Sequence, residues 1–422
     1  MNITKTAARE QSAALLPTYS ADTFGVCSVL FELGGMIVIH DPSGCNSTYT
    51  TLDEPRWYDH DSLIFISAMT EYDAILGRDD KLLRDIEEAA NEFHPNFICV
   101  IPSQIAHLIA TDLPALCRIL ARDTGIPAFT LPTNSMHPYE QGIGYALAHL
   151  ARHVAKKSAP QQKNALSKRP RINLLGLTPL DFHWQKALPS LKAFLAAHNL
   201  DLAASWTLGS TLADIESSAT ADLNLVLTQS ALPAAKILEG QLHIPYVVGI
   251  PFQPFEHELA VSLQAAACAP KISTHHHDAS KQRDFGSVGR FPWKFLGPQD
   301  RLFPREMPHA PATTPTSSRA SQNYIIGEPL ASACLAESLR RTTNETFDVL
   351  TPPFSEPDLI ATLKTANLVL ADPLYEALTP KVAHFLPIPH RACSGRTYEK
   401  QERNLLDPVE WAALLSEMKP YL

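Results

Sequence analysis

Two cysteines near the amino terminus are the residues of this chain best suited to metal chemistry. Cys27 stands just ahead of the apolar segment VLFELGG, and Cys45 closes the turn HDPSGC after the apolar run MIVIH. We expect both to lie in turns at one end of an α/β domain, where helix dipoles would lower their thiol pKa and favour metal binding. By residue type alone, one buried core cysteine and one free loop cysteine explain the pair better.

The remaining candidates for chemistry are weaker. Cys99, Cys117, Cys268 and Cys334 have apolar or small neighbours, which is typical of core cysteines. The tract THHHD at 274–278 has the composition of a metal site, but three adjacent histidines do not share one helix face. We interpret this tract as a loop.

Strands and helices alternate along the chain. We expect an amphipathic helix over 79–93, a buried strand over 96–102 and one helix over about 104–122. The pattern restarts after the basic stretch 156–171 and again after a Pro-, Ser- and Thr-rich stretch. Alternation of this kind predicts an α/β fold of three stacked Rossmann-like domains with mainly parallel sheets. The predicted units are 1–165, 166–265 and 321–422, with an irregular linker over 266–320.

Composition excludes several classes of protein. The net charge of -9 argues against a nucleic-acid surface, which needs clustered Lys and Arg. No apolar run reaches the roughly 18 residues of a membrane helix. The first twenty residues lack the long apolar stretch of a secretory signal, so we expect a cytoplasmic protein.

Several motifs occur in an order that resembles the nitrogenase component 1 family. They read GVCSVLFELGGMIVIHDPSGC, MTEYDAILGRDDKLLRDI and PNFICVIPSQIAHLIATDL, followed near the carboxyl end by IIGEP, LVLADPLYEAL and LPIPHRACSGRTYE. The family includes nitrogenase subunits, cofactor-assembly scaffolds and tetrapyrrole reductases. Each motif is loose, but the ordered set spans nearly the whole chain.

The resemblance implies a cofactor held by Cys27 and Cys45. In the family, three first-domain cysteines hold an iron–sulfur cluster shared between two subunits. The third family position falls near Gln104, which is not a thiolate. Two cysteines per subunit suit a [4Fe–4S] cluster completed by a second subunit, and a P-cluster-like centre remains the alternative.

The positions that hold the nitrogenase catalytic cofactor carry other residue types in this chain. They match Ala234 and Tyr398, neither of which is the expected Cys or His. His390 and Arg396 follow the last strand of the third unit, so with Gln104 they are candidate cleft residues. Arg396 would suit an anionic substrate or cluster.

The resemblance predicts a subunit of a nitrogenase-like two-component reductase, either catalytic or the non-catalytic partner. An ATP-dependent iron protein would supply electrons, because the chain has no G-x-x-x-x-G-K-[ST] motif of its own. The electrons would pass through the interface cluster to a substrate or cofactor in the inter-domain cleft. The partner subunit would be identical or homologous.

Two other functions remain open from the sequence. The first is a non-catalytic scaffold for assembly of an iron–sulfur metallocofactor, and the second is a binding module without a cluster. The substrate and the catalytic residues are not assigned.

Overall fold

Three four-stranded parallel sheets form the framework of this chain. The computed structural model describes residues 15–42, 44, 49, 54–157, 169–268 and 323–422. In each sheet the strands lie in the same order, with the second strand of the unit at one edge, then the first, third and fourth. The α/β architecture with parallel sheets predicted from the sequence is therefore confirmed.

The first sheet is built around the apolar strand β1, which is buried along its whole length. Such continuous burial is typical of a parallel strand covered on both faces. The sheet contains β1 (Met36–His40), β2 (Leu63–Ile66), β3 (Ile98–Pro102) and β4 (Ala128–Phe129), in the order β2-β1-β3-β4. Its helices are α1 (Asp22–Leu30), η2 (Pro55–Tyr58), α2 (Glu71–Leu76), α3 (Asp79–Phe93), α4 (Gln104–Leu108), α5 (Leu113–Thr124) and α6 (Tyr139–Lys157).

Helix α3 has the bounds expected from its periodicity, whereas the expected single helix over 104–122 is wrong. Two helices, α4 and α5, replace it. Asp112 starts the second by accepting a hydrogen bond from the backbone N–H of Ala115 at 3.0 Å. Pro114 lies in the first turn of α5, where its missing N–H costs little, but inside one continuous helix it would break the ladder.

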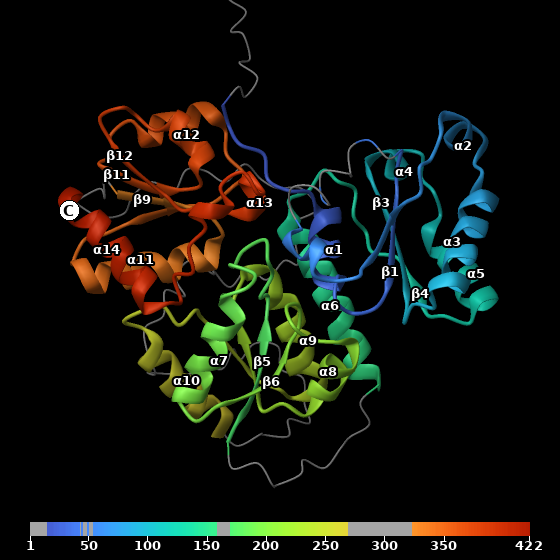
Figure 1. Cartoon of the computed structure of the whole chain (residues 1–422), viewed down its shortest axis with the longest axis horizontal. Coiled ribbons are helices and arrows are strands. Elements are labelled where there is room, and N and C mark those ends of the chain that lie inside the picture. Colours follow the sequence, from blue (N-terminus) through green and yellow to red (C-terminus); the bar gives the residue numbers. More distant parts are fainter. Residues whose placement is uncertain (1–14, 43, 45–48, 50–53, 158–168, 269–322) are drawn as a thin grey trace, which may run out of the picture.

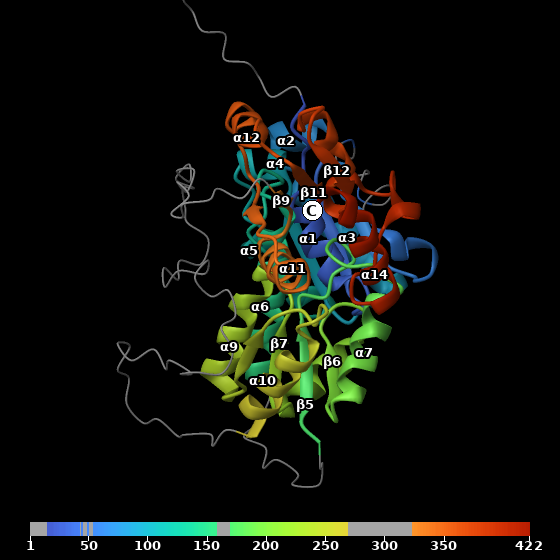
Figure 2. The ribbon, with the colours of Figure 1, turned by 90° about the vertical axis from the view of Figure 1, so that its left-hand side faces the viewer.

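The second and third sheets repeat the arrangement. The second contains β5 (Arg171–Leu175), β6 (Asp201–Ser205), β7 (Leu223–Val226) and β8 (Tyr246–Val248), with helices α7 (Ala187–Ala197), α8 (Leu212–Ser217), α9 (Leu232–Leu242) and α10 (Glu256–Cys268). The third contains β9 (Asn323–Ile326), β10 (Asp348–Leu350), β11 (Leu368–Ala371) and β12 (His384–Pro387), with helices α11 (Pro329–Thr343), α12 (Glu356–Leu363), η6 (Pro373–Leu378), α13 (Arg391–Ser394) and α14 (Pro408–Met418). Helices α7 and α9 lie on opposite sides of the second sheet (Figure 2).

The three sheets with their helices form three lobes around a common centre (Figure 1). Helices α1 and α6 lie at this centre and cross in backbone contact. A Cβ added to Gly25 would lie 2.0 Å from the carbonyl oxygen of Tyr139, and one added to Gly142 would lie 1.8 Å from that of Asp22. Only glycine permits such an approach, so these two residues fix how α1 lies against α6.

The predicted linker 266–320 and the tract at 274–278 lie almost entirely outside the described residues, as does most of the basic stretch 156–171. Within the described part of the chain, no helix combines the length and the apolar character needed to cross a membrane.

Candidate functional site

Cys27 lies inside a helix rather than in the expected turn. It is the sixth residue of α1, and its side chain is 0% exposed. It belongs to the same core cluster as Cys99 and Tyr49. Cys45 lies outside the described residues, so the structure does not test whether the two thiols meet.

The pKa of the Cys27 thiol is raised, whereas the sequence predicted that it would be lowered. Burial is the main cause, and the negative charge of Glu54 adds to it. The helix dipole does not offset these effects, because it acts mainly within the first turn and Cys27 stands beyond it. With these protein neighbours alone, Cys27 is a neutral thiol.

The residue type of Cys27 suits an iron–sulfur ligand, but its side chain is 0% exposed in the single chain, so the thiol would have to be uncovered before a second subunit could share the cluster. A hydrophobic shell is a normal feature of such sites, because it limits solvent access. Glu54 opposes a free thiolate, but a coordinated metal deprotonates a thiol outright. Among the described residues, no three His, Cys, Asp or Glu side chains are grouped as metal ligands would be.

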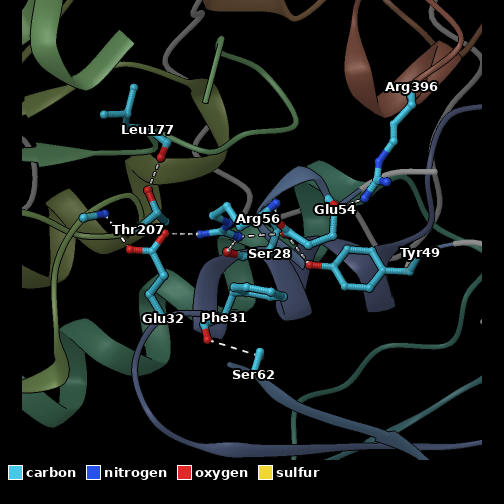
Figure 3. A network of polar contacts seen from close by, with 11 residues as sticks. Ser28, Phe31, Glu32, Tyr49, Glu54, Arg56, Ser62, Leu177, Thr207 and Arg396 are labelled. Carbon is cyan, nitrogen blue, oxygen red and sulfur yellow. Dashed lines mark hydrogen bonds and ion pairs between the residues drawn. The ribbon is translucent and has the colours of Figure 1, made fainter. Parts of the chain in front are cut away.

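Glu54, whose charge acts on Cys27, belongs to a buried charge network (Figure 3). The guanidinium of Arg56 donates to both carboxylate oxygens of Glu54 at 2.7 and 2.8 Å, and to Glu32 at 2.8 Å. It also donates to the backbone carbonyl of Ser28 at 2.8 Å. Tyr49 donates its hydroxyl to Glu54 at 2.7 Å. The side chains of Arg56 and Glu54 are 1% and 0% exposed, so water does not screen this pair.

The network ties the first lobe to the other two. Glu32 accepts a hydrogen bond from the backbone N–H of Gly209, in the second lobe, at 2.7 Å. Arg396, from the third lobe, donates to the backbone carbonyl of Glu54. Its guanidinium also lies 5.1 Å from the ring centre of Tyr58. Arg396 therefore has a structural partner, and the anion-binding role predicted for it stays a prediction.

The other two predicted cleft residues lie in different surroundings. Gln104 is the first residue of α4 and is exposed. His390 lies at the junction of the three lobes. Its Nε2 is 3.4 Å from the hydroxyl of Tyr139, on α6, and 3.4 Å from a carboxylate oxygen of Asp181, which follows β5. Tyr139 in turn donates to Asp181 at 2.5 Å.

Burial strongly changes the acidity of two further carboxyl groups at this junction. The pKa of Glu140, next to Tyr139 on α6, is raised to about 7, first by burial and also by the negative charge of Asp181. The pKa of Glu328, which follows β9, is raised to about 8 for the same two reasons. Groups that titrate near neutral pH are suited to proton transfer, and such groups gather at functional sites.

Sequence reasoning missed this acidic junction, although a signal for it existed. Asp181, Glu328 and Asp372 each follow a central strand of the second or third sheet, in the segments GLTPLD, GEP and ADP. Ligand-binding residues of parallel sheets are commonly found there. Glu140 and the network around Arg56 had no comparable signal.

A family model and several known proteins match part of the chain. A family model described as nitrogenase component 1 type oxidoreductase matches residues 23–262. A subunit of the light-independent protochlorophyllide reductase of Synechococcus sp. (strain CC9311) is 29% identical over 224 residues, covering 51% of this chain and 42% of that protein. The corresponding subunit from Prosthecochloris aestuarii (strain DSM 271 / SK 413) is 26% identical over 220 residues, covering 51% and 39%. The matches thus span about two fifths of the length of these relatives.

Solved structures resemble the chain over more of its length. One described as nitrogenase Cp1 at pH 6.5 has a TM-score of 0.59 at 13% identity, covering 96% of this chain and 94% of that one. A second, described as nitrogenase Cp1 at pH 5, has a TM-score of 0.50 at 16% identity, covering 96% and 72%. At these identities the likeness concerns the fold.

Proposed function

Because the chain belongs to the nitrogenase component 1 type family of oxidoreductases, as its motifs predicted, we propose that it is a component 1 subunit of a two-component reductase. An ATP-dependent iron protein supplies the electrons, and a substrate or metallocofactor at the three-lobe junction receives them. The observation that carries this proposal is the family match over residues 23–262.

The junction supports this location for the substrate. Tyr139, Asp181 and His390 come from three separate lobes and lie within hydrogen-bonding or ion-pairing distance of one another. Reduction of an organic or metal-bound substrate consumes protons as well as electrons. Buried groups that titrate near neutral pH are suited to supply them.

In this proposal Cys27 and Cys45 hold the iron–sulfur cluster, together with cysteines of an identical or homologous subunit. Such a cluster, of the [4Fe–4S] or a larger P-cluster-like type, supplies one-electron transfer when bound. This chain would contribute the Cys27 thiol, which α1 holds in surroundings that exclude water.

Anaerobic purification with iron and sulfide counts and EPR spectroscopy tests the ligands. The variants are Cys27→Ala and Cys45→Ala, and Cys99→Ala is the matched control because Cys99 is also 0% exposed in the same core. We expect loss of iron and of the EPR signal in the first two variants and retention in the third. Unchanged iron in both variants would overturn the assignment, and equal loss in all three would attribute it to packing.

The alternative is a scaffold that carries a metallocofactor and hands it on. Ala234, at one of the two positions matched to cofactor ligands, is 0% exposed inside α9. The residue at the other is Tyr398, so neither position offers a thiolate or an imidazole. ATP-dependent reduction of a substrate such as protochlorophyllide, which the named relatives reduce, would favour the reductase. Transfer of a cluster to an apo-acceptor without turnover would favour the scaffold.

A further inference from the structure

Several carboxyl groups and the imidazole of His390 lie at the three-lobe junction. Glu140, Asp181 and Glu328 interact electrostatically with one another, and the imidazole of His390 interacts with Glu140, Asp181 and Asp372. The acids are Glu140, Asp181, Glu328 and Asp372. Ionising every carboxyl group in one buried site is unfavourable because the negative charges repel one another, so some of these groups keep their protons.

In three of these four acids, both carboxylate oxygens accept hydrogen bonds from the protein. Asp181 accepts hydrogen bonds from the hydroxyls of Tyr139 and Thr178. Glu328 accepts from the backbone N–H groups of Gln229 and Ala331. Asp372 accepts from the backbone N–H groups of Leu374 and His390 and from the hydroxyl of Ser394. These carboxyl groups join the lobes and cap local structure.

Glu140 differs from the other three. Its Oε2 is buried and has no hydrogen-bond partner among the described residues. A buried polar atom without a partner costs about 1–3 kcal/mol, so it calls for an explanation such as a catalytic role. Burial raises the pKa of Glu140 to about 7, and a protonated Oε2 would therefore be common at neutral pH.

The groups that face Glu140 come from several elements. They are Asp181 after β5, Glu328 after β9, His390 before α13, Tyr375 on η6, Tyr19 ahead of α1, and the adjacent Tyr139. Among these groups only His390 can carry a positive charge. Burial alone would lower its pKa, but the hydrogen bond and charge of Asp181 outweigh this and raise it. An imidazolium there would stabilise a carboxylate left on Glu140.

We propose that Glu140 is the proton donor for the substrate reduced at the junction. This inference rests on the proposed function. The iron–sulfur cluster of the proposed function would supply the electron for this reduction when bound. The O–H bond of Glu140 then breaks, and its proton forms a new bond to the reduced atom. The carboxylate that remains takes its next proton from His390, which is recharged from water.

Infrared difference spectroscopy of the full chain tests whether Glu140 holds the proton. We expect two protonated-carboxyl contributions in wild type at about pH 6, one lost as pH rises through about 7 and the other, from Glu328, lost at about 8, and only the first should be absent from Glu140→Gln. Glu328→Gln should retain the band of Glu140. Absence of any band that depends on Glu140 would overturn the inference.

Turnover against pH tests whether the proton is used. With protochlorophyllide, ATP and a nitrogenase-reductase-type iron protein, we expect the wild-type kcat to fall as pH rises through about 7. Glu140→Gln should lower kcat by about 100-fold or more and remove this limb. Glu328→Gln should keep the limb. If Glu140→Gln keeps it as well, the inference is wrong. If wild type turns over nothing, the proposed function fails, and the infrared band decides separately whether Glu140 stores a proton.

Discussion

Replacement of Arg56 by methionine should selectively destabilise the centre of the first lobe. The change removes a guanidinium that is 1% exposed and donates to Glu54, to Glu32 and to the carbonyl of Ser28. Removing one partner of a buried pair costs about 3–5 kcal/mol, because the other charge stays buried without compensation. The double variant Arg56→Met with Glu54→Gln should regain much of this loss, since no unpaired charge then remains at Glu54.

Hydrogen exchange measured on peptides that cover α1 is the suitable assay. A three-lobed chain need not unfold in one step, so a local measurement is better defined than a single global midpoint. We expect the free energy of opening for α1 to fall by about 3–5 kcal/mol in Arg56→Met. Arg122→Met is the control, because Arg122 pairs with Asp123 on the exposed surface of the same lobe, and it should leave α1 unchanged.

A fall of less than about 1 kcal/mol in Arg56→Met would refute this reasoning, because it would mean that the pair behaves like an exposed one. Failure of the double variant to recover would instead indicate that Arg56 acts mainly by packing. Its guanidinium lies 4.5 Å from the ring centre of Phe31, so that contact would then be the main term.

Three other predictions concern the helix crossing, the acidic junction and the thiol. Gly142→Ala should lower the melting temperature, because its Cβ would lie 1.8 Å from the carbonyl oxygen of Asp22, and calorimetry checks this. The pKa of Glu140 is raised from 4.5 to about 7 on folding, so between these values the folded chain keeps a proton that the unfolded chain has lost. Stability should therefore fall by about 3 kcal/mol as pH rises through this window, and Glu140→Gln should flatten that part of the curve in melts taken across pH. Cys27 should resist alkylation by iodoacetamide in the native protein purified without iron and react after unfolding, as mass spectrometry of its peptide would report. Rapid native alkylation would contradict its burial.

Much of the fold follows from local pattern. The run MIVIH becomes the fully buried strand β1, and the acidic first turn and apolar spacing of α3 place that helix within 79–93. The break between α4 and α5 was missed because apolar residues continue across it. The signals that end and restart the helix are Asp112 and Pro114, which hydrophobic periodicity does not register.

The candidate site was less predictable. Cys27 was predicted as a ligand from the family resemblance, but its acidity depends on burial and on Glu54, which is 27 positions away and approaches only in the folded chain. The contacts of His390 were also not predictable from the sequence. Tyr139 and Asp181 stand in other lobes, so no spacing in the sequence relates the three.

The glycine crossing at the centre of the molecule bears on the proposed supply of electrons and protons. Helix α1 carries Cys27, and helix α6 carries Glu140, and at the crossing no side chain separates their backbones. Sliding or rotation of one helix against the other would therefore cause backbone clashes at the crossing. If the outer lobes rearrange around a substrate, this crossing would hold α1 against α6, and with them the proposed cluster ligand Cys27 and the proposed proton donor Glu140.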